Sequence, residues 1–192
     1  MRLMAGWAKM AKSICAMDRS STIELMLDHV SWLPSRGLRV WLPAGWAAAP
    51  FEAGSTLMED ECLRFVEICR RHGATRIVCA TFEREGAPEV LEDDLEPSAL
   101  DSLQRRLAGQ YQILADDQLT LIVIFFSTVD SGIVFGAREE CSEFLGVGLD
   151  SAIQDFRGTV GVWGERLAQR LAQAPWNDLA SGGPARTVEI AL

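Results

Sequence analysis

The chain has 192 residues, of which 48% are hydrophobic and 23% are charged, and its formal net charge is -9 at pH 7. These apolar side chains suffice for one core, so the composition is typical of a globular protein and not of a disordered one. Because negative charge repels phosphate, the composition disfavours direct binding to nucleic acid and favours a basic protein partner. We therefore expect a single domain over residues 1–192.

The sequence shows no feature of a membrane or secreted protein. No apolar run approaches the roughly 20 residues that a membrane-spanning helix needs. The five cysteines are an odd set without the dense spacing of a secreted disulfide scaffold. Near the N-terminus, Lys9 and Lys12 interrupt the apolar region that a signal peptide requires. These features predict a cytoplasmic protein with free thiols and no membrane span.

In residues 1–19, apolar side chains recur at steps of four and three, which predicts an appended amphipathic helix. The apolar positions are Leu3, Trp7, Met10, Ile14 and Met17. Such a helix either docks on the body of the protein or lies on a membrane surface. A translation start at one of the later methionines is a third possibility.

The next segment predicts a helix, a short strand and a loop. Ser21 has capping-box spacing, and the helix that it opens should end near Pro34. A strand is expected over residues 38–42. Residues 44–55 are rich in Ala, Gly and Pro, which predicts a loop anchored by one tryptophan and one phenylalanine.

A second capping box, at Thr56, opens a helix whose apolar face continues to Gly73. The β-rich run that follows, residues 76–82, predicts a strand. Residues 38–82 therefore read as strand, helix, strand. A further helix is expected over residues 97–109, where proline begins it and glycine ends it.

The strongest strand pattern comes next. Residues 111–115 and 118–126 predict a hairpin, and a polar turn then leads into residues 133–135, so three strands form a meander. Residues 121–126 are apolar on both alternating faces, which is typical of a central strand covered on both sides. The helices expected to cover it span residues 137–145, 149–156 and 162–174.

The C-terminal residues 177–192 contain a linker-like Ser-Gly-Gly-Pro break, so they form either a mobile tail or an edge strand over residues 187–192. Together these elements predict an α+β fold. Its sheet is expected to be mixed or antiparallel, with about four to five strands, a central meander and a cover of helices.

Residues 83–96 hold seven carboxylates and a single basic residue, Arg84. A run of charge is often no more than a solvated loop, but it also suits docking to a basic protein. The partner-binding residues predicted on this ground are Glu83, Glu85, Glu89, Glu92, Asp93, Asp94 and Glu96.

No catalytic residue, metal site or cofactor is predicted. Cys62, Cys69, His72 and Cys79 include types that bind zinc, but no C-x-x-C pair occurs and the cysteines occupy core positions. His72 at a helix end is better placed to contact terminal carbonyls than to activate a thiol. No phosphate-binding glycine motif and no G-x-S-x-G motif is present.

In residues 119–146, a strand, a polar turn and a second strand ending Gly-Ile-Val-Phe-Gly lead into an acidic helix with Phe-Leu-Gly. This order is similar to that of small bacterial immunity proteins. The resemblance implies a protein that neutralises a cognate toxin by occluding it. A nuclease-type toxin has a basic active site, to which an acidic inhibitor would be steered.

We therefore expect a cytoplasmic, non-enzymatic acidic binding protein, an immunity protein whose partner is a basic toxin domain. One alternative is a small enzyme or ligand-binding domain that uses residues 45–55. An enzyme should show a pocket in which a perturbed acid or thiol meets convergent polar groups. The other alternative is an accessory protein that docks through residues 1–19.

Overall fold

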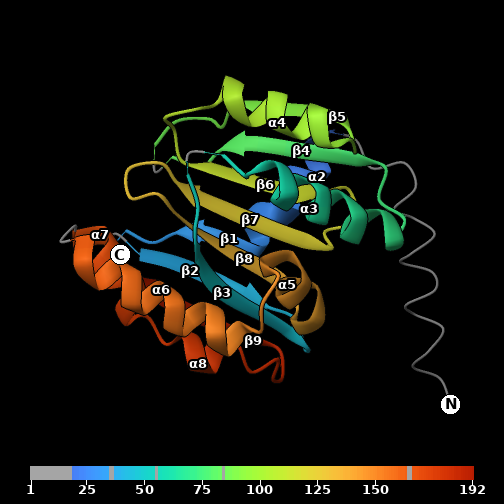
Figure 1. The fold of residues 1–192 in the computed structure, drawn as a ribbon. Helices are drawn as coiled ribbons and strands as arrows, with labels where there is room; N and C mark the ends of the chain where they lie inside the picture. The colour runs from blue at the N-terminus through green and yellow to red at the C-terminus, as the bar shows by residue number, and fades with distance from the viewer. Residues whose placement is uncertain (1–18, 35–36, 55, 84, 164–165) are drawn as a thin grey trace, which may run out of the picture.

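The computed structural model describes residues 19–34, 37–54, 56–83, 85–163 and 166–192. The helix predicted over residues 1–19 lies outside this part of the chain, except for its last residue, Arg19, which begins α2 (Arg19–His29). The fold is α+β, with two antiparallel sheets and helices on both sides of the larger one (Figure 1).

The larger sheet has six strands in the order β3-β8-β7-β6-β4-β5, and every pair is antiparallel. The strands are β3 (Trp46–Glu52), β4 (Arg76–Thr81), β5 (Val90–Asp94), β6 (Gln112–Asp116), β7 (Leu121–Phe126) and β8 (Ser131–Ala137). The predicted meander is confirmed as β6-β7-β8. All six residues of β7 are buried, as expected for a strand that is apolar on both faces.

A smaller sheet joins segments from the two halves of the sequence. Its order is β1-β2-β9, with β1 (Val30–Trp32), β2 (Gly37–Leu42) and β9 (Arg186–Ala191). The C-terminal segment is thus an edge strand, paired with β2 from Gly37 to Leu42. The described residues form nine strands in sheets of six and three, where the sequence predicted one sheet of about four to five strands.

The larger sheet lies between two layers. On one face pack α3 (Glu59–Arg71) and α5 (Arg138–Leu145), while α2 and the smaller sheet lie on the other face (Figure 1). The α4 helix (Pro97–Arg106) packs against α3 and β5. The α6 (Leu149–Trp163) and α8 (Trp176–Leu179) helices contact β3, and α7 (Arg166–Gln173) contacts α6 and β9.

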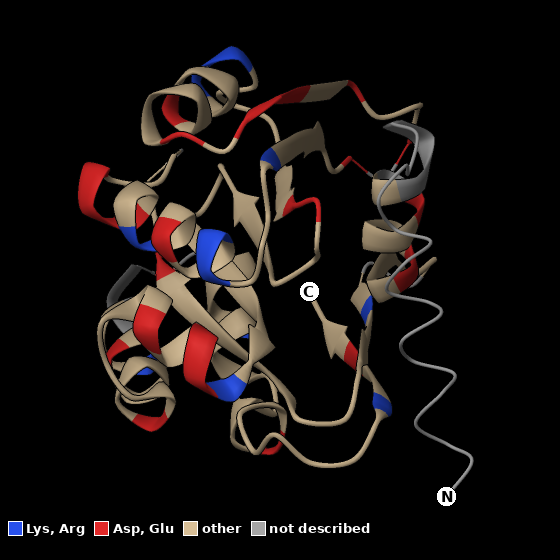
Figure 2. Cartoon of the chain, turned by 90° about the vertical axis from the view of Figure 1, so that its right-hand side faces the viewer, with Lys and Arg blue, Asp and Glu red and all other residues tan. Residues whose placement is uncertain are grey.

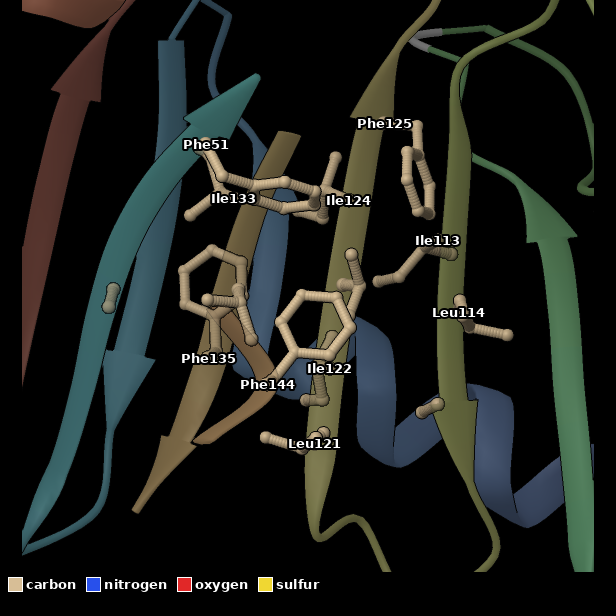
Figure 3. Packing of buried hydrophobic residues seen from close by; sticks show 14 of the residues in the cluster. Phe51, Ile113, Leu114, Leu121, Ile122, Ile124, Phe125, Ile133, Phe135 and Phe144 are labelled. Carbon is tan, nitrogen blue, oxygen red and sulfur yellow. The ribbon is translucent and has the colours of Figure 1, made fainter. Parts of the chain in front are cut away.

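Aromatic side chains join the sheet to α3 and α5. Phe51 meets Phe125 and Phe144 edge to face, with ring centroids 6.1 and 5.5 Å apart, and Phe65 meets Phe144 at 6.4 Å. Figure 3 shows Phe51, Phe125 and Phe144 among the aliphatic side chains of β6, β7 and β8. Edge-to-face contacts of this kind add to the burial of apolar area.

Residues 44–55 were predicted as a loop, and this prediction was wrong: residues 46–52 form β3. Alanines and a proline have low strand propensity, but pairing with β8 overrides it. Pro50 is tolerated because β3 is an edge strand with a ladder on one side only. The predicted loop anchors, Trp46 and Phe51, are strand residues paired with Ala137 and Gly132.

Two other boundaries differ from the prediction. The first helix ends at His29, five residues before Pro34, because the chain enters β1 and pairs with β2. The cap of α3 lies two residues later than predicted, where the Met58 N–H donates to Glu61 Oε2 over 2.8 Å. Within the described part of the chain, no helix combines the length and the apolarity needed to cross a bilayer.

Candidate partner-binding surface

The acidic segment is held by the edge of the larger sheet. The chain leaves β4 at Thr81, makes a loop, and returns as β5, antiparallel to β4. Two hydrogen bonds between Thr81 and Glu89 close this loop. The Thr81 N–H donates to the Glu89 carbonyl (2.9 Å), and Thr81 Oγ1 accepts from the Glu89 N–H (2.8 Å). Figure 2 shows the resulting band of acidic residues along β5 and the adjoining loop.

Residues 90–96 were read as part of an acidic loop, but residues 90–94 form the edge strand β5. Two carboxylates of residues 90–96 form ion pairs. Glu92 lies 3.3 Å from Arg76, with only 7% of its side chain exposed, and Glu96 pairs with Arg70 at the start of α4. Asp93 Oδ1 accepts from the N–H of Asp94 (2.8 Å). These groups stabilise the strand and its end.

The loop carboxylates have a different environment. Glu83, Glu85 and Glu89 are exposed, and Glu83 Oε1 accepts from the Tyr111 N–H (3.0 Å). Glu85 and Glu89 have no ion-pair partner among the described residues, which do not include Arg84. Both side chains are exposed at the surface of the loop.

These three glutamates border a cavity of about 540 Å³ that we call the Trp32 groove. Its walls also include apolar side chains from three separate segments, namely Leu27 of α2, Trp32 of β1, and Phe82 and Pro88 beside the acidic loop. Trp32 is fixed by a hydrogen bond from Nε1 to the Phe82 carbonyl (2.9 Å) and stacks on Phe82 at 5.3 Å. An acidic rim thus surrounds a rigid aromatic wall.

Sequence reasoning missed the apolar half of this groove. Trp32 was expected in the first helix, and its partner Phe82 lies 50 residues further along the chain. The only signal in the sequence was a tryptophan two residues before the proline near which the predicted helix ends. Its position beside the acidic segment depends on how β1 folds behind the larger sheet.

At the opposite end of β4, a carboxylate is fully buried. Asp116 accepts from the N–H groups of Gln118 (2.9 Å), Thr120 (2.8 Å) and Leu121 (3.1 Å). The Cys69 thiol also donates to it, over 3.4 Å. Burial raises the pKa of Asp116, and the N–H groups oppose that shift. The Asp116 side chain holds the β6–β7 turn in place.

The four cysteines in the described part of the chain are poorly suited to nucleophilic chemistry. Burial raises the pKa of Cys62 and of Cys79 to about 12, and it also raises the pKa of Cys69 and Cys141. Such thiols stay protonated at neutral pH, whereas the thiolate is the reactive form. In the part of the chain that the structure covers, no three His, Cys, Asp or Glu side chains are grouped to bind a metal.

One further polar pair lies near this end. His72 Nε2 is 3.2 Å from Glu140 Oε1, and both residues line a shallow cavity of about 350 Å³ with Trp46 and Thr120. The Glu140 Oε2 atom is buried without a hydrogen-bond partner. Residues 45–55, named for an alternative ligand site, mainly form β3, whose residues 47–51 are buried.

No protein-family model, curated protein or solved structure matches this chain.

Proposed function

We propose that this chain is a non-enzymatic binding protein that docks a cationic protein partner through the acidic surface of residues 83–96. The observation that carries the proposal is the environment of Glu85 and Glu89. Both carboxylates are exposed at the rim of the Trp32 groove, with no ion-pair partner among the described residues. An exposed acidic rim on a chain of net charge -9 favours a basic partner.

We further propose that the partner is a basic toxin domain, of the nuclease type, and that the chain acts as a cytoplasmic immunity protein. Negative potential would steer the chain to the phosphate-binding face of such a toxin. The folded body would then block the path of the nucleic acid. This mechanism requires no bond to be made or broken by the chain itself.

The test uses the full chain as bait in extract from its native cells. The captured protein is identified, purified and assayed for nuclease activity with and without the chain. We expect a basic partner whose nuclease activity is inhibited at equimolar chain, and an association rate that falls as salt rises. A partner that is acidic, or whose activity is unaffected, would contradict the proposal.

The matched variants change charge equally at two places. The double variant Glu85→Lys and Glu89→Lys should lower the association rate at low salt by about tenfold or more. Glu67→Lys with Asp155→Lys makes the same charge change on the exposed faces of α3 and α6 and should have a much smaller effect. Equal effects of the two double variants would remove the acidic loop from the interface.

A further inference from the structure

We infer that the Trp32 groove receives one long basic side chain, a lysine or an arginine, from the cationic partner. This inference rests on the proposed function for the charge of the partner, and it specifies what that partner inserts. The groove has apolar walls from Leu27, Trp32 and Pro88 and a rim of carboxylates from Glu83, Glu85 and Glu89. Lysine and arginine complement this arrangement, because each carries a cation at the end of an apolar stem.

Because the groove has apolar walls, we expect the apolar stem of the inserted side chain to contribute to binding together with its charge. A stem of methylene groups that packs against Leu27 and Pro88 is removed from water, which contributes roughly 0.8 kcal/mol for each CH₂ fully buried. Trp32 is held by its hydrogen bond to the Phe82 carbonyl, so its side chain loses little conformational freedom on binding.

The carboxylates of residues 92–96 do not offer such a site. Glu92 and Glu96 are paired with Arg76 and Arg70, and Asp93 accepts from the backbone of its neighbour. None of them borders the Trp32 groove. We therefore expect the β5 carboxylates to add a diffuse attraction, while the groove selects the side chain. Its volume of about 540 Å³ also accommodates residues that flank the inserted one.

The experiment is a titration of the ¹⁵N-labelled full chain with three capped glycine pentapeptides that differ at the central position. One peptide carries lysine, one norleucine, which keeps the stem without the charge, and one 2,4-diaminobutyrate, which keeps the charge with a shorter stem. We expect the lysine peptide to shift the amide signals of residues 27–32 and 82–89. The norleucine and diaminobutyrate peptides should each bind about fivefold more weakly.

Two double variants of equal charge locate the site. Glu85→Gln with Glu89→Gln should weaken the lysine peptide about fivefold. Asp93→Asn with Asp94→Asn removes the same charge from β5 and keeps the oxygen that accepts from residue 94, so it should change affinity less than about twofold. Leu27→Ala, at an exposed position of α2, should weaken the lysine peptide about twofold without affecting the fold.

Diaminobutyrate binding as tight as lysine would show that charge alone acts and would overturn the inference. Norleucine binding as tight as lysine would overturn it as well, and so would signal shifts centred on β5.

These outcomes differ from failure of the proposed function. If a basic partner docks normally on the Glu85/Glu89 glutamine variant, the groove is excluded while the binding function stands. If the lysine peptide binds in the groove but no basic partner is captured, the proposed function fails.

Discussion

The two ends of β4 carry similar residue types and use them in opposite ways. Beside the first residues of β4, the carboxylate of Asp116 in β6 is buried and accepts from three backbone N–H groups, which satisfy it within the fold. After β4, Glu85 and Glu89 are exposed beside Trp32, and neither forms an ion pair with another described residue. Acidic side chains therefore differ in role according to whether the fold supplies their donors.

This difference separates structural carboxylates from those available for binding. A satisfied buried carboxylate should contribute strongly to stability, because its removal leaves buried donors without acceptors. An exposed carboxylate without a partner should contribute little to stability, and its removal should be felt only when a ligand is present. Variants at the two ends of β4 test this contrast directly.

The largest effect is expected at Asp116. Asp116→Ala leaves the N–H groups of Gln118, Thr120 and Leu121 without their acceptor in a buried turn. We expect a loss of about 3 kcal/mol in the free energy of unfolding, measured by urea denaturation. Asp117→Ala is the control, since Thr75 is its one hydrogen-bond donor among the described residues, and it should cost about 1 kcal/mol. Equal losses would refute the structural role of Asp116.

A pH effect is expected at His29, which is buried between Trp41 and Trp46 with ring centroids 4.9 Å from each. Burial lowers the pKa of His29 below 6.5. As pH falls below about 6.5, the unfolded chain binds a proton that the folded chain does not, so stability falls until the pH reaches the folded pKa.

The slope from this one residue is at most about 1.4 kcal/mol per pH unit. His29→Asn removes the titrating ring, so its free energy of unfolding should fall less steeply than that of the unaltered chain between pH 6.5 and 5. The measurement is urea denaturation at several pH values. Identical slopes would show that His29 does not cause the acid sensitivity.

The smallest effects compare the two halves of the acidic segment. Glu92→Gln removes the partner of Arg76, and we expect a loss of about 1 kcal/mol in the free energy of unfolding because the Glu92 side chain is largely buried. Glu85→Gln should change stability by less than about 0.5 kcal/mol. Thermal or urea unfolding measures the free energy of unfolding of each single variant, and the two losses are compared. A larger loss from Glu85→Gln would mean that the loop carboxylates are structural.

Much of the fold followed from periodicity. The apolar run of β7 predicted a central strand, and the one-faced apolar pattern of α3 predicted that helix within a few residues. These elements are predictable because their own side chains determine which face is buried. The α+β class and the β6-β7-β8 meander follow from the same signals.

The elements that were missed depend on their neighbours. The alanines of β3 and the carboxylates of β5 have low strand propensity, and both strands form because a strongly apolar strand offers them a ladder. For the same reason the candidate site was only half predictable. The acidic residues are visible in the sequence, whereas the wall formed by Trp32 and Leu27 exists only after distant segments pack together.

The pairing of β2 with β9 also affects the order in which the two sheets form during synthesis. Residue 38 pairs with residue 190, so the middle strand of the smaller sheet has no partner on that side until β9 has left the ribosome. The β6-β7-β8 meander is local and can close much earlier. Translation should thus complete the larger sheet before the smaller sheet closes.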